Sequence, residues 1–310
     1  MYYPYLRGKQ FELLALREFI DFNEGGSKIL PIIEPVKASF NSMKIALNKF
    51  ISADFSFALV LNPQCGDVVG KTRLILTELN DELSDREKWM PAYLVNHNSI
   101  KIKQHIEVEE FSNVMLICSD SVDVNDPNFT DLIDSPSISR FLIAGDNRSL
   151  KRKLDRLGKE VVRLDDQFKP QKKNVDYIGI TEEKFTEEHR YFAEDGYAGF
   201  SDYTVLSKDF AEGGRLPYAV AIHLTYEKNP DEIWIRHFVS DTNDDNTNIQ
   251  GKFGEAAKKA VEFFQGIGYS NEALKELTNY YYEAQYPGLG VLKKISIRSH
   301  IELVNSISQR

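Results

Sequence analysis

The 310-residue sequence predicts an α/β fold: a (β/α)8 barrel of TIM-barrel type with an added β-hairpin and C-terminal helices. Through residue 206, apolar runs typical of buried parallel strands alternate with helix patterns. The alternation then ends, and two runs of period two precede three helix patterns. Eight strands in this length fit a closed barrel, and an open doubly wound sheet is the alternative because it shows the same alternation.

The barrel strands are predicted as short, mostly apolar runs. They are Met1–Leu6, Lys28–Glu34, Phe57–Leu61, Pro91–Val95, Val114–Cys118, Arg140–Ala144, Glu160–Leu164 and Tyr197–Leu206. The helices between them follow from apolar residues at spacings of three and four. They are 11–22, 39–51, 71–83, 100–111, 129–133, 149–157 and 182–192. Strict alternation implies parallel strands joined by helical crossovers.

The hairpin is predicted from two alternating runs, Ala219–Tyr226 and Ile233–Val239, joined by a polar turn that contains Pro230. Three helices follow, at 252–264, 271–284 and 292–307. We therefore predict residues 1–206 as the barrel. Residues 207–310 are predicted as a hairpin and helical extension packed on the barrel in a single structural unit.

Composition limits the function classes. The net charge of −9 opposes non-specific binding to nucleic acid, which needs an excess of Lys and Arg. Two cysteines far apart in sequence are typical of buried thiols in a reducing compartment. The sequence shows no secretory signal pattern and no apolar run near the ~20 residues that span a bilayer. We therefore expect a cytoplasmic protein.

Polar side chains follow each predicted strand, where the βα loops of a barrel converge and barrel enzymes carry their active sites. They are Arg7, Glu34, Lys37, Asn62, Gln64, Asn96, His97, Asp120, Asp146, Asp165, Asp166 and Asp202. The set holds more carboxylates and amides than lysines, which suits a metal, a sugar or a cationic group better than a bare phosphate. The alternative is that these are ordinary solvated residues, because strands that reach water end in polar side chains.

Two histidines fall on the hairpin. A turn of five residues, Lys228–Glu232, places His223 directly opposite His237, whereas a six-residue turn places another residue there. With Asp202 or Asp241 nearby, the two imidazoles would suit a metal site, or an acid–base pair with an orienting carboxylate. The alternative is a packed, hydrogen-bonded histidine pair with a structural role.

Two loops place glycines and lysines before a helix, as anion sites do. Residues 65–72 resemble a phosphate-binding loop, although Cys65 stands where that motif requires glycine. Residues 288–294 form the second loop. An ordinary loop that starts a helix is the alternative in both places.

Five stretches of the sequence share a resemblance to one known group. They are Tyr2–Leu16, Leu30–Pro35, Gly199–Tyr203, Ala221–Tyr226 and Ile233–Arg236. Together they resemble the "beta" protein group of phage and bacterial genomes, and in particular a bacterial subgroup with no assigned activity. The resemblance covers most of the chain and implies a (β/α)8-type barrel followed by a hairpin. Members often lie near mobile or phage-conflict genes, so it also implies a role in anti-phage defence. It implies no catalytic residues.

Two functions are therefore hypotheses. The first is a hydrolase-type enzyme acting at the barrel mouth, where Arg7 and Lys37 hold an anionic part of the ligand. Its candidate catalytic residues are Glu34, Asp165, Asp202 and His223, and its candidate substrate-binding residues are Arg7, Lys37, Asn62, Asn96 and His237. The second is a non-catalytic recognition protein that binds a partner protein from the same locus through the hairpin and C-terminal helices. The sequence identifies no cofactor and no metal-ligand set.

Overall fold

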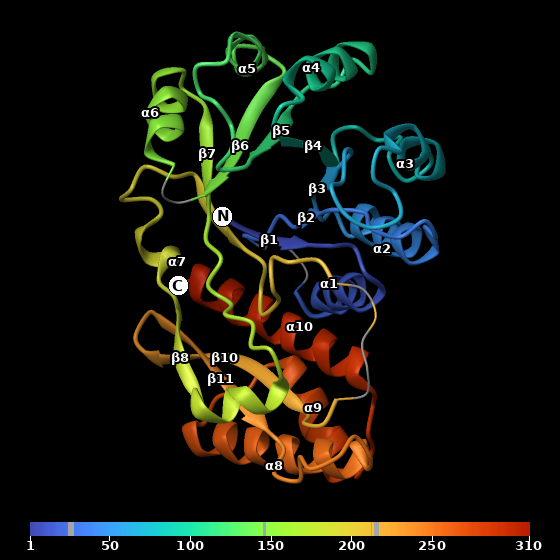
Figure 1. Ribbon diagram of the computed structural model, residues 1–310, viewed down its shortest axis with the longest axis vertical. Helices are drawn as coiled ribbons and strands as arrows, with labels where there is room; N and C mark the ends of the chain where they lie inside the picture. Colours follow the sequence, from blue (N-terminus) through green and yellow to red (C-terminus); the bar gives the residue numbers. More distant parts are fainter. Residues whose placement is uncertain (24–27, 145–146, 212, 214–216) are drawn as a thin grey trace. The chain divides into compact units, whose positions relative to one another are not determined.

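A computed structural model describes residues 1–23, 28–144, 147–211, 213 and 217–310, and Figure 1 labels its helices and strands. The chain forms two compact units. The barrel unit consists of Met1–Gln10, Lys28–Asp166 and Glu188–Asp202. The C-terminal unit consists of Phe11–Ser27, Gln167–Glu187 and Tyr203–Arg310, so two of its segments come from the first 187 residues of the chain.

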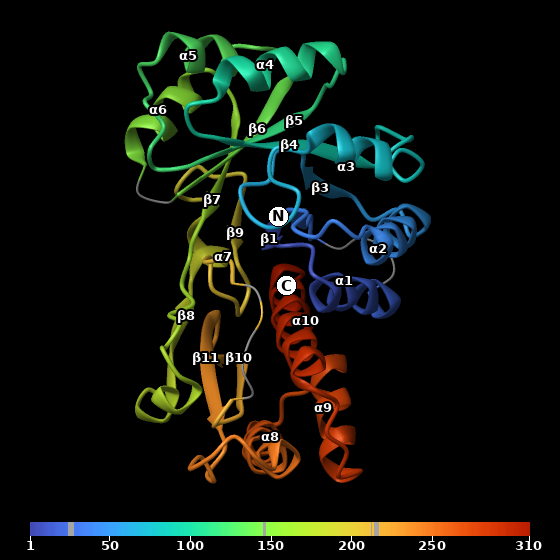
Figure 2. The same cartoon turned by 45° about the vertical axis from the view of Figure 1, so that its right-hand side comes forward.

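The barrel unit is a closed sheet of parallel strands in the order β1-β2-β3-β4-β5-β6-β7-β9 (Figure 2). Its strands are β1 (Tyr2–Leu6), β2 (Ile32–Ile33), β3 (Phe57–Val60), β4 (Trp89–Val95), β5 (Val114–Cys118), β6 (Ile138–Ala144), β7 (Glu160–Leu164) and β9 (Gly199–Asp202). Its helices are α2 (Asn41–Ser52), α3 (Thr72–Glu78), α4 (Ser99–Val108), α5 (Pro127–Ile133), α6 (Arg148–Arg156) and α7 (Glu188–Tyr191). The predicted (β/α)8 barrel is confirmed.

The two faces of the barrel strands can be told apart by their contacts. Arg140 of β6 lies 5.6 Å from the Tyr3 ring of β1, although these strands are not neighbours, so both side chains point into the barrel. The residue Phe200 has the opposite orientation, because its ring packs on Phe192, outside the sheet. Side chains alternate along a strand, so Tyr5 shares the inner face with Tyr3.

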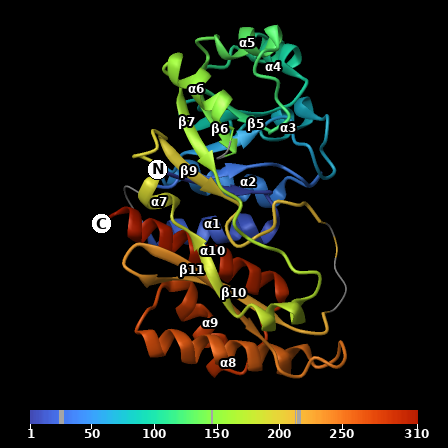
Figure 3. The same cartoon turned by 60° about the vertical axis from the view of Figure 1, so that its left-hand side comes forward.

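The C-terminal unit is built on an antiparallel sheet in the order β10-β11-β8 (Figure 3). The strands are β8 (Glu182–Thr186), β10 (Ala221–Asn229) and β11 (Glu232–Val239). Its helices are α1 (Gln10–Phe22), the 3-10 helix η1 (Asn174–Gly179), α8 (Ile249–Ile267), α9 (Glu272–Tyr282) and α10 (Leu289–Ser308). The predicted hairpin is present as β10 and β11, and His223 pairs with His237 through a register shift between Glu227 and Asn229.

One face of this sheet supplies the core of the C-terminal unit. Ile222, Leu224 and Tyr226 alternate along β10 and pack with side chains of α8, α9 and α10, among them Phe253 and Leu277. Each large apolar side chain buried in this way stabilises the fold by about 1.5–3 kcal/mol. The period-two pattern of the hairpin therefore arises because one face of its sheet is buried against these helices.

The helix predicted over residues 182–192 is wrong. The structure has strand β8 there, followed by the short helix α7. Glu182 accepts hydrogen bonds from the Tyr226 hydroxyl at 2.8 Å, from Lys228 at 2.6 Å and from Arg236 at 2.8 Å, all on the hairpin. These cross-strand partners favour the strand over the helical preference of a Glu-rich segment, because β-pairing depends on neighbouring strands.

In the part of the chain that the structure describes, no helix combines the length and apolar character that crossing a membrane requires.

Candidate functional site

The inward face of the barrel carries a cluster centred on Glu34, which follows β2 and is fully buried. Its Oε2 accepts a hydrogen bond from the Tyr5 hydroxyl at 2.7 Å and forms an ion pair with Arg7. Its Oε1 accepts from the backbone N–H of Gln64 at 2.9 Å and lies 3.6 Å from Cys65 Sγ. The cluster joins the ends of β1 and β2 to the loop after β3, at the rim where barrel sites form.

This bonding determines what Glu34 can do. A carboxylate oxygen offers about two acceptor positions, and both oxygens of Glu34 already have two donors each. The arrangement suits a group that positions Arg7 better than one that exchanges protons with a substrate.

Cys65 is a donor in this cluster and not an activated nucleophile. Burial, together with the negative charge of Glu34, raises the pKa of the Cys65 thiol to about 11. At neutral pH the side chain is therefore a thiol, whereas nucleophilic attack needs the thiolate.

The two predicted asparagines support the loops of the barrel rim. Asn62 donates from Nδ2 to the carbonyl of Leu94 and accepts from its N–H, each at 2.8 Å, which extends the pairing of β3 with β4. Asn96 accepts from the N–H of His97 at 2.5 Å. Since these amide groups already bind backbone, they define the shape of the rim.

Other rim residues have contacts of their own. Lys37 is exposed, with its Nζ 4.0 Å from Asp67. Asp165 continues β7, and its N–H donates to the carbonyl of Ser201 at 2.8 Å. Asp146 lies outside the described residues.

Asp202 lies on the outer face of the barrel. It is two residues from Phe200, whose ring stacks on Tyr2 and packs against Phe192. The Tyr2 hydroxyl donates to Asp202 Oδ1 at 2.5 Å. Arg7 and Glu34 are thus brought together on the inner face, and Asp202 is not part of that group.

In and just before the loop at residues 65–72, two backbone N–H groups have partners within the protein. The N–H groups of Gln64 and Asp67 donate to Glu34 and to the carbonyl of Val36, at 2.9 and 2.8 Å. Gly66 has φ +79, and a Cβ there would stand 2.2 Å from the Val36 carbonyl oxygen. Close packing against Val36 therefore explains this glycine without a phosphate.

The hairpin histidines form an edge-to-face pair in the C-terminal unit, with an angle of 77° between the rings. Nδ1 of His223 lies 2.8 Å from Nδ1 of His237, so one ring donates and the other accepts. The Tyr177 ring packs on both imidazoles, with centroids 4.6 and 4.5 Å away. The carboxylate of Glu183 is 3.9 Å from His237 Nε2, and Asp241 pairs with Lys259 instead.

Burial lowers the pKa of His223 to about 3, with help from His237, and lowers the pKa of His237 to about 4. Both rings are therefore neutral at neutral pH. Within the described ranges, no group of three or more His, Cys, Asp or Glu side chains is arranged to hold a metal ion. The geometry matches the packed, hydrogen-bonded pair.

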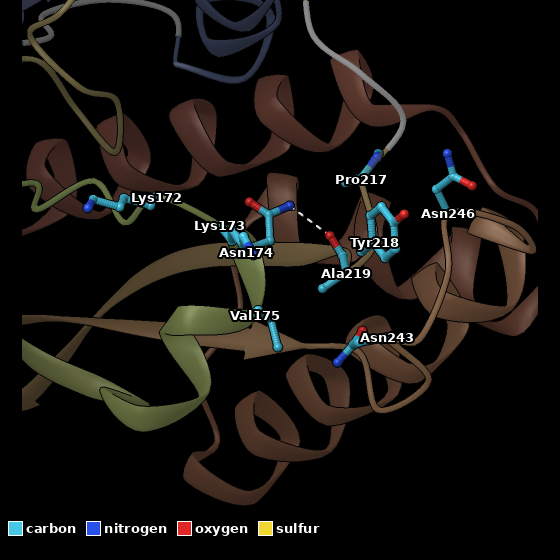
Figure 4. Close-up of a pocket in the computed structure, with 9 residues that line it drawn as sticks. All are labelled: Lys172, Lys173, Asn174, Val175, Pro217, Tyr218, Ala219, Asn243 and Asn246. Carbon is cyan, nitrogen blue, oxygen red and sulfur yellow. Dashed lines mark hydrogen bonds between the residues drawn. The ribbon is translucent and has the colours of Figure 1, made fainter.

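A polar pocket lies beside this pair in the C-terminal unit, with a volume of about 860 Å³. Figure 4 shows residues from three separate segments around it: 172–175 before and within η1, 217–219 before β10, and Asn243 and Asn246 after β11. Val175 and Ala219 also belong to an apolar cluster with Tyr177. The pocket floor therefore continues into the packing around the histidines.

The polar groups of the pocket are of two kinds. Asn174 donates to the Ala219 carbonyl at 2.7 Å, and Asn243 accepts from Ser240 Oγ at 2.6 Å, so these amides fix the walls. The side chains of Lys172 and Lys173 are exposed and form no ion pair among the described residues, while the Lys173 backbone N–H donates to Asp176 Oδ2 at 3.0 Å. None of the nine lining residues is acidic.

Sequence reasoning missed this pocket. Its lysines and asparagines come from loops that are about 70 residues apart at the extremes, and no motif joins them. The run of two lysines before Asn174 was the one available signal, and a solvated loop explains such a run equally well.

The chain matches no family model, no curated protein and no solved structure. Function is therefore inferred from the side chains themselves. The predicted combination of rim residues with His223 and His237 joins residues of different units and stays a prediction.

Proposed function

We propose that this chain is a recognition protein whose C-terminal unit binds a small anionic ligand in the pocket beside the hairpin. The observation that carries the proposal is the pair Lys172 and Lys173, two cations at a pocket without acidic lining. The predicted catalytic residues Glu34, Asp202 and His223 are, by contrast, all engaged in hydrogen bonds within the protein. Side chains held in this way favour binding over catalysis.

The charge balance shapes this binding. The whole chain carries −9, which repels anions at long range. Attraction must therefore come from the two lysines at short range, where it exceeds the screened field of distant carboxylates. We expect the affinity to fall as the salt concentration rises. We also expect slow association, because the net charge gives an anion no long-range attraction.

Inorganic pyrophosphate is the probe for this proposal. In calorimetric titration at low salt, the wild type binds it, and the double variant Lys172→Ala/Lys173→Ala binds at least about 10-fold more weakly, because two charge contacts are lost. The matched control is Lys258→Ala/Lys275→Ala, which removes two exposed lysines of α8 and α9 outside the pocket. Equal affinity in both variants, or no binding by the wild type, would contradict the proposal.

A hydrolase acting at the barrel rim is the second candidate. It is supported by the Glu34 cluster, in which Arg7 is held for an anionic substrate group at the C-terminal ends of the strands. Glu34→Gln keeps the shape and removes the charge that positions Arg7. We expect a loss of at least about 100-fold in activity on a panel of p-nitrophenyl phosphates, esters and glycosides. The control is Lys44→Ala on α2, and an inactive wild type counts against this candidate.

Membership of the beta protein group, a partner protein from the same locus and a role in anti-phage defence also stay predictions. They rest on the sequence resemblance, and a phage-challenge assay of cells with and without the gene tests the last of them.

A further inference from the structure

We infer that the pocket of the C-terminal unit takes a nucleotide, with its phosphate at the two lysines and its base against Tyr218. This inference rests on the proposed anion-binding function and adds the chemical class of the ligand. Four features support it: the separation of unlike groups along the pocket, an exposed aromatic ring, an exposed amide and the size of the cavity.

The pocket has chemically different ends. Figure 4 shows Lys172 at one end and Asn246 at the other, with Tyr218 on the side of Asn246. A ligand that fills the pocket must therefore be anionic at one end only. Inorganic phosphate can contact only the lysines, whereas a nucleotide can place its phosphate at the lysines and its uncharged base at the other end.

Tyr218 is an aromatic ring left in water. Its exposed fraction is 58 %, which is high for a large aromatic side chain beside a pocket. A flat ring in this position offers a surface on which a base can stack, and such stacking contributes substantially to nucleotide binding. Ribose phosphates, which lack a base, cannot use it in this way.

Asn246 completes the base end. Its amide is exposed, and no described residue partners it. An amide carries a donor and an acceptor side by side, which matches the edge of a nucleobase. The amides of Asn174 and Asn243 are already bonded within the protein, so Asn246 is the lining asparagine that can turn to a ligand.

The volume agrees with this ligand. About 860 Å³ lies within the range of roughly 300–1,000 Å³ typical of small-molecule and cofactor sites. The pocket wall near Tyr218 is well packed, because Ala219 belongs to the buried cluster that contains Tyr177 and Val239.

The experiment compares AMP, ribose 5-phosphate and inorganic phosphate by calorimetric titration of the full chain. We expect AMP to bind at least about 10-fold more tightly than ribose 5-phosphate. Tyr218→Ala should abolish this difference and leave ribose 5-phosphate binding unchanged, whereas Tyr218→Phe, which keeps the ring, should preserve it.

The outcomes separate this inference from the proposal beneath it. If AMP and ribose 5-phosphate bind equally, or if Tyr218→Ala keeps the preference for AMP, the nucleotide inference is overturned while anion binding stands. If none of the three ligands nor pyrophosphate binds, the proposed function itself fails. Lys172→Ala/Lys173→Ala should weaken all three ligands together.

Discussion

Replacing Arg298 by alanine should lower the free energy of unfolding of the C-terminal unit by about 3–5 kcal/mol at neutral pH. Arg298 lies on α10 and is only 3 % exposed. It donates to Glu302 at 2.7 Å and to Glu18 of α1 at 3.0 Å. Removing Arg298 leaves the buried Glu302 without its cation, whereas Glu18 keeps Lys294, and an uncompensated buried charge costs more than the pair itself contributes.

The state of Glu302 explains the size of this effect. Glu302 is also buried, and desolvation raises its pKa, while Arg298 opposes that rise. Without Arg298, the carboxylate either stays charged in an apolar site or takes up a proton. Both outcomes destabilise the folded state at neutral pH.

The chain offers a selective probe for this measurement. Trp89 belongs to the barrel unit and Trp234 to the C-terminal unit. In a Trp89→Phe background, tryptophan fluorescence during urea unfolding therefore reports the C-terminal unit. The control is Lys275→Ala, which breaks an exposed pair with Glu272 and should cost less than about 1 kcal/mol. A loss below that value for Arg298→Ala would show that the network contributes little.

Acid should destabilise the C-terminal unit well before its carboxylates are protonated. An unfolded histidine takes up a proton near pH 6.5, but folded His223 and His237 do so only near pH 3 and 4. The unfolded state therefore binds more protons between these values. The stability due to the neutral pair is fully present above pH 6.5 and is lost as the pH falls toward 4.

We expect the free energy of unfolding to fall by an amount on the order of 3 kcal/mol for the pair by pH 4. This is less than the sum of the two pKa shifts would give, because the rings share one hydrogen bond and His223 is partly exposed. Neighbouring groups act in both directions: Lys293 lowers the pKa of His223, and Glu183 raises that of His237. Nuclear magnetic resonance of the imidazole protons provides the direct check. Titration of either ring with a midpoint near 6.5 would refute the prediction.

A variant comparison supports that check. In His223→Asn/His237→Asn, the free energy of unfolding should change less between pH 6.5 and 4 than in the wild type. His105, whose pKa burial also lowers, is present in both proteins and cancels in the difference.

The barrel could be predicted from sequence because its strands are buried on both faces. Runs such as Phe57–Val60 and Val114–Cys118 are almost entirely apolar, which marks parallel strands wherever they lie. The pairing of His223 with His237 was predicted for a five-residue turn, Lys228–Glu232, but the structure reaches it differently. The strands continue to Asn229 and from Glu232, and a register shift between Glu227 and Asn229 places the two histidines opposite each other.

Other features depended on contacts that a single sequence does not display. β8 has helical composition and becomes a strand through Tyr226, Lys228 and Arg236. Lys294, predicted as part of an anion-binding helix start, is 3 % exposed and is paired with Glu18 and Glu276. Its partners come from α1 and α9, so tertiary structure alone determines its role.

The outward position of Asp202 was within reach of the sequence. Small residues, Gly199 and Ser201, alternate with Phe200 and Asp202 along β9. The crowded interior next to Tyr3 requires the small pair, since a Cβ on Gly199 would meet the Tyr3 ring at 2.6 Å. The polar character of Asp202 favoured the rim interpretation instead.

The division of the chain has a consequence for synthesis on the ribosome. When residue 202 has been made, every barrel strand exists, but β8 and α1 still lack β11 and α10. At that stage Arg236, the ion-pair partner of Glu182, and Lys294, the partner of Glu18, have not yet been made. β8 and α1 therefore stay unpaired until the last hundred or so residues are synthesised. A nascent chain stalled after residue 202 would expose them to chaperones and proteases.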